Sequence, residues 1–139
     1  MEPQLKGRSI LIVDDHEPHR TLLINYLGGL GCRCVGASGG EEGLARMREE
    51  NFELVLLDLA MDDLDGMEVL KRAQSESLAQ HYIMMSAQGT ISNAVEAIRL
   101  GAHDFLVKPF ELAQLLELVT RVLRATTPGK GPSPDSRLV

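Results

Sequence analysis

Five short apolar runs recur along the chain. Continuous runs cover residues 10–13, 54–57, 82–85 and 105–107, and a weaker run covers residues 32–37. Apolar residues that follow one another without alternation are typical of strands covered on both faces, as in a parallel sheet between helices. The pattern therefore predicts five strands of a buried parallel sheet.

The segments between these runs carry apolar residues three and four positions apart, which is the spacing of one helix face. The stripes comprise Leu22, Leu23, Tyr26, Leu27 and Leu30; Leu44 and Met47; Met67, Leu70 and Ala73; Ile91, Ala94, Val95 and Ile98; and Leu112, Leu115, Leu116, Val119, Val122 and Leu123. Pro18 suits a first helical turn. Two pairs, Ser38 with Glu41 and Asp65 with Glu68, have the spacing of a capping box. We therefore expect a helix after each strand.

Strands and helices thus alternate along the chain. Because crossovers between parallel strands are right-handed, this alternation favours an α/β fold with a three-layer, doubly wound parallel sheet. A length of 139 residues suits one domain. Residues 126–139 are rich in Pro, Gly and Ser and have no apolar period, so we expect a flexible tail or the start of an interdomain linker there.

The composition argues against several classes of function. The chain has 14 Lys and Arg against 20 Asp and Glu, whereas nucleic-acid binding needs basic residues against phosphates. Cys32 and Cys34 stand too close together for an unstrained disulfide and lack the partners of a zinc site, so we interpret them as core residues in a reducing compartment. No signal peptide is visible, and no apolar run approaches the about 18 residues of a membrane span. We expect a cytoplasmic protein without membrane contact.

Polar residues follow the apolar runs where each run ends. These residues are Asp14, Asp15, Asp58, Ser86 and Lys108. Each has an ordinary structural interpretation when taken alone, such as a helix cap for Asp14 and Asp15 or a turn for Asp58. However, the carboxyl ends of parallel strands line the ligand crevice of an open α/β sheet. We therefore expect three carboxylates, a hydroxyl and an ammonium group to meet at one edge of the sheet.

This combination favours phosphoryl transfer. Three neighbouring carboxylates repel one another unless a cation neutralises them, and Mg²⁺ suits a site with few protein ligands and several waters. A carboxylate-bound metal beside a lysine and a hydroxyl is the apparatus of phosphoryl transfer. Asp58 stands alone and is the candidate nucleophile, whereas the pair Asp14 and Asp15 suits metal binding.

Over residues 7–125 the sequence resembles the receiver domain of bacterial two-component response regulators. The matching motifs are residues 10–15, residues 56–58 with Met61 and Asp65-Gly66, Ser86-Ala87, and Lys108-Pro109-Phe110. Residues 94–110 further resemble receivers of the nitrogen-regulator class of transcriptional activators. The resemblance implies a flavodoxin-like (βα)5 fold with strand order 2-1-3-4-5, and a signalling protein rather than an enzyme.

The resemblance also implies a role for each residue of the site. Asp58 matches the phosphoacceptor, which takes a phosphoryl group from a histidine of a partner sensor kinase. Asp15 matches a direct Mg²⁺ ligand, Asp14 a residue that holds the ion through water, and Ala60 a backbone carbonyl ligand. Lys108 matches the lysine that binds the phosphoryl group.

A second group of residues matches the switch of the family. Ser86 matches the hydroxyl that moves toward the phosphoryl group, and Phe105 the aromatic residue whose rotation accompanies activation. The bond between Lys108 and Pro109 is expected to be cis. The face formed by residues 91–98, 105–107 and 112–123 is expected to carry the output, which includes transcription regulation through an effector domain and a homodimer whose formation responds to phosphorylation.

The sequence departs from the family at a few positions. Asp62 and Asp63 follow Met61 where the family often has Pro, and we hypothesise that they only solvate the loop rather than add a second metal site. His16 is interpreted as a helix-entry residue. The other histidines, His19, His81 and His103, have no ligand-like spacing and receive no role.

Two alternatives remain open from the sequence. A receiver-like interaction module that is never phosphorylated would share the fold, although the complete set of site residues argues against it. A hydrolase that forms an aspartyl phosphate would need an acid two residues after the nucleophile, where this chain has Ala60.

Overall fold

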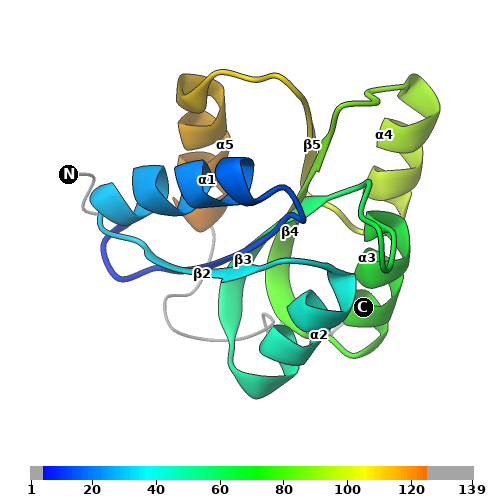
Figure 1. Ribbon diagram of the computed structural model, residues 1–139, viewed down its shortest axis with the longest axis horizontal. Coiled ribbons are helices and arrows are strands. Elements are labelled where there is room, and N and C mark those ends of the chain that lie inside the picture. The colour runs from blue at the N-terminus through cyan, green and yellow to red at the C-terminus, as the bar shows by residue number, and fades with distance from the viewer. Residues whose placement is uncertain (1–4, 125–139) are drawn as a thin grey trace.

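One sheet of five parallel strands forms the centre of the computed structural model, which describes residues 5–124 (Figure 1). The strands lie in the order β2-β1-β3-β4-β5. Their bounds are β1 Ser9–Val13, β2 Arg33–Ala37, β3 Phe52–Asp58, β4 Ala79–Ser86 and β5 Asp104–Val107. All five predicted strands are present, and the order and direction confirm a doubly wound, flavodoxin-like fold.

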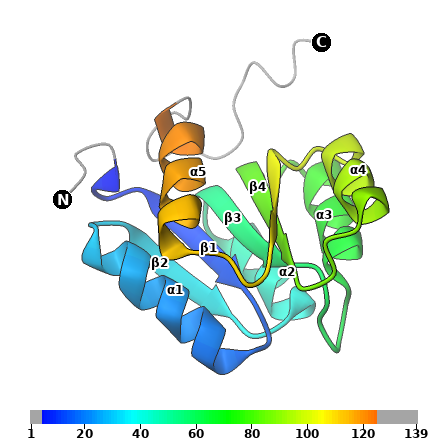
Figure 2. The same cartoon turned by 90° about the horizontal axis from the view of Figure 1, so that it is seen from above.

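One helix follows each strand. The helices are α1 Glu17–Gly29, α2 Gly40–Glu49, α3 Gly66–Ser75, α4 Ile91–Arg99 and α5 Leu112–Arg124. Helices α1 and α5 cover one face of the sheet, and α2, α3 and α4 cover the other (Figure 2). The three predicted layers are therefore confirmed. Within residues 5–124, no helix is long and apolar enough to cross a membrane.

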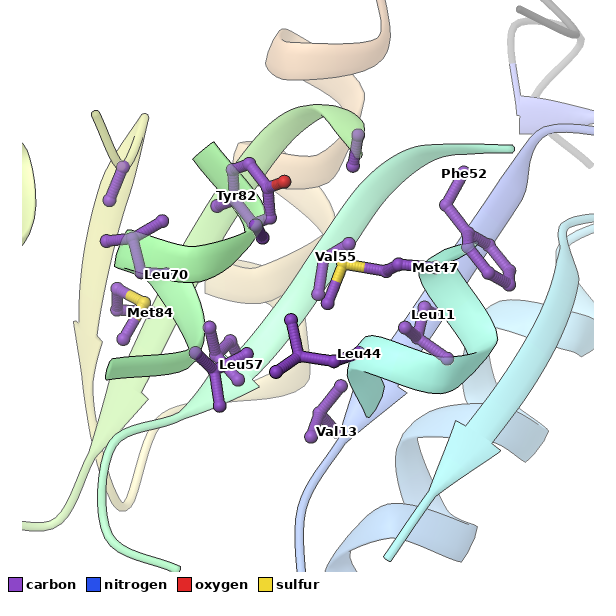
Figure 3. Packing of buried hydrophobic residues seen from close by; sticks show 14 of the residues in the cluster. Leu11, Val13, Leu44, Met47, Phe52, Val55, Leu57, Leu70, Tyr82 and Met84 are labelled. Atoms are coloured by element: carbon purple, nitrogen blue, oxygen red, sulfur yellow. The ribbon is translucent and has the colours of Figure 1, made fainter. Parts of the chain in front are cut away.

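Neighbouring strand residues contribute to opposite cores. In β1, Leu11 and Val13 pack toward α2 and α3, whereas Ile10 and Ile12 pack toward α1 and α5. Figure 3 shows the first of these cores, where Leu44 of α2 lies beside the sheet. Each fully buried Leu, Ile or Val stabilises the fold by about 1.5–3 kcal/mol. Burial on both faces explains why β1 and β3 are continuous apolar runs in the sequence.

Two predicted helix starts are confirmed. Pro18 lies in the first turn of α1. Asp65 precedes α3, and its carboxylate accepts hydrogen bonds from the backbone N–H groups of Met67 and Glu68. These N–H groups have no partner within the helix, so the cap stabilises the start of α3.

The capping box predicted from Ser38 and Glu41 is wrong. The residue that precedes α2 is Gly39, which has no side chain to cap the helix. Ser38 instead donates from its backbone N–H and its hydroxyl to Oε1 of Glu42, at 2.7 and 2.9 Å. The acid that bonds to Ser38 is therefore Glu42, one residue later than a capping box requires. The first N–H groups of α2 are bound by a different acceptor.

That acceptor is Asp63, which lies in the loop after β3. Its Oδ1 accepts a hydrogen bond from the N–H of Gly40, and its Oδ2 accepts one from the N–H of Glu41, both at 3.0 Å. These bonds lower the pKa of Asp63. The hypothesis that Asp62 and Asp63 only solvate the loop is therefore wrong for Asp63, which fastens this loop to α2.

Helix α4 exposes most of the apolar stripe that predicted it. Ile91, Val95 and Ile98 are 84%, 51% and 49% exposed, and Ala97 is the residue that α4 buries. The spacing correctly predicted a helix, but this face of the helix points away from the sheet. An apolar patch therefore lies on the surface at α4.

Cys32 and Cys34 are free thiols, as expected. Cys32 is buried and Cys34 half-buried, and both pack in the core on the α1 and α5 side. Burial raises the pKa of Cys34 to about 12 and that of Cys32 to about 11, so both stay protonated near neutral pH.

Candidate functional site

Three carboxylates meet at the carboxyl ends of the central strands. Asp14 and Asp15 follow β1 directly, and Asp58 is the last residue of β3. One oxygen atom from each of the three lies within 4.8 Å of the others. The side chain of Asp14 is fully buried, and Asp58 is almost fully buried. Strands that are distant in sequence thus place all three predicted acids at one edge.

Lys108 lies between two of these acids. Its Nζ is 3.3 Å from Oδ2 of Asp14 and 3.3 Å from Oδ2 of Asp58. Lys108 follows β5, and its backbone N–H donates to the carbonyl of Ser86 at the end of β4. The bond between Lys108 and Pro109 is cis. The ammonium group thereby compensates part of the negative charge that the fold buries here.

The pKa of Asp14 is lowered although the residue is buried. Burial alone raises it, but this effect is outweighed by hydrogen bonds from His19 and from the N–H of His16, and by the charge of Lys108. The distances are 2.6 Å between His19 Nδ1 and Oδ2, and 2.9 Å between the His16 N–H and Oδ1. Asp14 is therefore held as a carboxylate.

The pKa of Asp58 moves in the opposite direction. Burial and the negative charge of Asp14 raise it, Lys108 offsets this rise only in part, and the resulting pKa is about 6. Asp58 thus carries a charge that its surroundings stabilise poorly. A cation at the acidic cluster, or a positive group brought to it, would relieve this deficit.

Asp15 is the most accessible of the three acids. Its Oδ2 accepts a hydrogen bond of 3.1 Å from the N–H of Asp62 in the loop after β3. Gly66 ends that loop, and its N–H donates a hydrogen bond to the carbonyl of Leu59. Only glycine fits at this position, because an added Cβ would lie 2.3 Å from the carbonyl oxygen of Asp58. Ala60, the predicted carbonyl ligand, is exposed within the loop.

The two predicted switch residues lie on neighbouring strands. Ser86 is the buried last residue of β4, and its Oγ accepts a hydrogen bond from the N–H of Gln88 at 2.9 Å. Phe105 of β5 is half-buried and pairs with Met84, two residues before Ser86. Alternation along β4 therefore puts Ser86 and Phe105 on the same face of the sheet, beside α4.

His19 is a residue of the site that the sequence analysis missed. It lies in α1, contacts Asp14, and packs its ring edge-on against Phe110 with 5.7 Å between ring centroids. His19 lacks the spacing to other ligand residues that marks a metal-binding histidine in a sequence. The available signal was its position in the first turn of a helix that begins at the acidic edge.

A groove of about 600 Å³ adjoins the acidic cluster. It lies between the start of α1 and the segment after β5, and its walls include His19, Leu22, Lys108 and Phe110. Most of this lining is apolar. Lys108 and His19 therefore face both the groove and the buried acids.

Comparisons with known proteins agree on one family. A family model described as "Response regulator receiver domain" matches residues 10–120. The transcriptional regulatory protein ZraR of Salmonella typhimurium is 38% identical over 123 residues, which are 88% of this chain and 28% of ZraR. The chain thus spans little more than a quarter of the length of that relative.

Solved structures show the same fold. The receiver domain of NtrX from Brucella abortus is 33% identical with a TM-score of 0.77, covering 83% of this chain and 98% of that one. The CheX-CheY-BeF3-Mg²⁺ complex from Borrelia burgdorferi matches with 28% identity and a TM-score of 0.80, covering 84% of this chain and 90% of that one.

Proposed function

Because the chain belongs to the response regulator receiver domain family, we propose that Asp58 is its phosphoacceptor and that Lys108 binds the transferred group. A receiver domain implies a sensor histidine kinase as the partner that supplies the phosphoryl group. One observation carries the assignment: Lys108 Nζ lies 3.3 Å from an oxygen of Asp58, at the acidic edge of the sheet. This protein is a signalling domain of a two-component system.

The transfer forms one bond and breaks another. An oxygen of Asp58 bonds to phosphorus, and the bond from phosphorus to the imidazole nitrogen of the kinase breaks, which leaves the electron pair on the ring. The ammonium group of Lys108 now contacts Asp58. It is close enough to contact the phosphoryl oxygens instead once they are bonded to Asp58, and to stabilise their negative charge. The raised pKa of Asp58 makes its carboxylate more basic, and therefore a stronger nucleophile once it is ionised.

The donor set fits Mg²⁺. It consists of carboxylate oxygens, it is reached from solvent at Asp15, and burial with the charge of Asp14 raises the pKa of Asp58. Hard divalent cations prefer such oxygen ligands, and Mg²⁺ keeps several waters. We assign Asp14, Asp15, Asp58 and the carbonyl of Ala60 to the metal centre. When bound, the ion neutralises charge on the phosphoryl oxygens.

Ser86 and Phe105 are proposed to carry the signal away from the site. Ser86 Oγ accepts from the N–H of Gln88, so its own proton is available for an oxygen of the phosphoryl group. This added bond stabilises the conformation with Ser86 drawn inward, which is a population shift. Phe105 shares the face of Ser86 and lies against the core beneath α4, so its rotation would follow that movement.

The output is proposed to involve α4, β5 and α5. These elements carry the exposed apolar residues of α4, and we propose that they form a homodimer whose stability responds to phosphorylation. Similarity to ZraR supports transcription regulation through an effector domain. We propose residues 7–125 as the receiver domain. The flexible tail or linker expected at 126–139 lies outside the described residues, and a cytoplasmic location stays a prediction.

Intact-mass spectrometry after incubation with acetyl phosphate tests the assignment. We expect a Mg²⁺-dependent phosphoryl adduct that is stable in acid and labile in base, and that Asp58→Asn abolishes. Asp62→Asn, a matched change of an accessible acid in the adjoining loop, should keep the adduct.

Other outcomes would overturn the proposal. An adduct that persists in Asp58→Asn would assign the phosphoryl group to a different residue. Absence of an adduct together with no binding of beryllofluoride would favour the interaction module that is never phosphorylated. Steady turnover of acetyl phosphate, at a rate far above that of one loading event, would favour the hydrolase.

A further inference from the structure

His19 makes the shortest described side-chain contact with the buried acid Asp14. Its Nδ1 lies 2.6 Å from Oδ2, and the side chain of Asp14 is 0% exposed whereas that of His19 is 20% exposed. The imidazole also packs against the ring of Phe110, with 5.7 Å between the ring centroids and 71° between the ring planes. A ring fixed in this way presents Nδ1 to Asp14 with little freedom to turn.

Asp14 depends on a small number of hydrogen-bond donors. Oδ1 accepts from the N–H of His16, while Oδ2 accepts from both His19 and Lys108. A buried carboxylate that loses a donor destabilises the protein strongly, because the desolvated charge is then uncompensated. How easily one donor can move away from Asp14 therefore depends on which other donors remain bonded to its carboxylate.

Lys108 is the donor that has to leave. Its Nζ is shared between Asp14 and Asp58 at equal distances of 3.3 Å. If Asp58 takes a phosphoryl group, the ammonium group is drawn toward the new oxygens and away from Oδ2 of Asp14. A second donor on that same oxygen lowers the cost of the move, and His19 is in place to provide it.

We propose that His19 is a positioning residue for phosphorylation: its Nδ1 hydrogen bond keeps the Asp14 carboxylate satisfied, so that Lys108 can move from Asp14 to the phosphoryl group. His19 acts through Asp14 and does not touch the phosphoryl group. The inference rests on the proposed roles of Asp58 and Lys108. The proposed role requires a hydrogen-bond donor at the position of His19 Nδ1, within reach of Oδ2 of Asp14.

Three substitutions separate this role from simple packing. His19→Asn places an amide nitrogen near the position of Nδ1, His19→Gln places it near that of Nε2, and His19→Leu removes the donor. We expect the rate of phosphorylation by acetyl phosphate at saturating Mg²⁺ to fall about tenfold or more in the Leu and Gln variants. A loss of this size is typical when a residue that hydrogen-bonds to a metal ligand is removed. The Asn variant should stay near the wild-type rate.

Two further measurements control the experiment. Thermal unfolding shows that each variant is folded, and His103→Leu, a change of an exposed histidine outside the site, should leave the rate unchanged. A rate equal to wild type in His19→Leu would overturn the positioning role, and so would an equal loss in the Asn, Gln and Leu variants. Failure of the wild-type protein itself to load would instead refute the proposed function of Asp58.

Discussion

Asp14 and Asp58 are buried side by side, yet their pKa values move in opposite directions. Burial acts on both, but Asp14 gains hydrogen bonds from His19 and the N–H of His16, and its pKa falls. Asp58 has Lys108 beside it and also the negative charge of Asp14, and its pKa rises to about 6. The difference lies in the donors. It leaves Asp58 as the less stabilised of the two carboxylates.

The raised pKa of Asp58 predicts that Asp58→Asn stabilises the protein at neutral pH. The folded pKa of about 6 exceeds the unfolded value of 3.8, so folding favours the protonated acid. The contribution of Asp58 to stability is therefore fully present below about pH 4 and is lost as the pH rises through 6. At pH 7.5 without Mg²⁺, Asp58→Asn should raise the free energy of unfolding by about 1–3 kcal/mol.

Urea unfolding of both proteins in EDTA, followed by circular dichroism from pH 4 to 8, measures this difference. We expect it to shrink toward pH 4 and to shrink also when Mg²⁺ is added at pH 7.5. Asp62→Asn serves as the control, because it makes the same change at an exposed side chain of the adjoining loop. A constant difference across the pH range would contradict the prediction.

Asp15 offers a separate test of the proposed metal centre. It is the acid through which solvent reaches the cluster, so Asp15→Asn should remove a ligand and leave the buried acids in place. We expect the affinity for Mg²⁺, measured by isothermal titration calorimetry, to fall at least about tenfold. Glu17→Gln removes one charge from an exposed residue near the site and should change the affinity far less. Equal losses in the two variants would show that net charge alone attracts the ion.

Site residues at the ends of apolar runs could be predicted from the sequence, whereas a site residue within a helix could not. Asp14, Asp58 and Lys108 were found because each follows an apolar run, and parallel strands bring their ends together. His19 was missed because its contact depends on where α1 starts and on the support of its ring by Phe110. The sequence places His19 in the first turn of the helix that follows the acidic pair, but it does not show which way the side chain points.

At the scale of elements, the acid that caps α2 comes from a distant loop. Asp63 accepts from the N–H groups of Gly40 and Glu41, which have no partner inside the helix. Asp63→Ala should therefore lower the free energy of unfolding by about 1–2 kcal/mol in urea denaturation. Asp62→Ala, next to it in the same loop, should cost much less. Stability equal to wild type in Asp63→Ala would show that water replaces the cap.

Helix ends provide a second test at this scale. Gly31 and Gly101 end α1 and α4 with positive φ, and after α3 the same position is taken by Ser77 with a φ of 52°. A side chain strains the left-handed conformation, so Ser77→Gly should stabilise the protein by about 0.5–1 kcal/mol in thermal or urea unfolding. Ser75→Gly, within α3, should act in the opposite direction. A loss in Ser77→Gly would mean that chain entropy outweighs the strain.

All five strands and helices could be predicted because burial on both faces and helical spacing are local patterns. The start of α2 could not, since Ser38 and Glu41 imitate a capping box while the actual cap is 22 residues from Glu41. Local spacing also could not tell that the stripe of α4 faces outward. The error at α2 comes from a tertiary contact that overrides a local signal, and the direction in which a helix face points is likewise set by tertiary packing.

At the scale of the whole molecule, most of the exposed large apolar side chains of residues 5–124 lie on α4 and β5. Ile91, Val95 and Ile98 of α4 are all about half or more exposed, and Val107 of the neighbouring β5 is 48% exposed. The elements α4 and β5 lie in contact at the edge of the sheet, away from β2 (Figure 1). Contiguous apolar residues at a surface are typical of an interface. Ser86 and Phe105 lie beneath this patch, so movement at the acidic site can reach it.

This arrangement predicts that a phosphoryl mimic changes self-association through α4. With beryllofluoride and Mg²⁺, the wild-type protein should shift toward a dimer in sedimentation velocity or size-exclusion runs, and Ile98→Glu should stay monomeric because a charge would be buried without a partner. Leu22→Glu makes the same change at a residue of α1 that is 48% exposed, and it should still dimerise. No shift in the wild-type protein would refute this output. An equal shift in Ile98→Glu would place the interface on another face of the molecule.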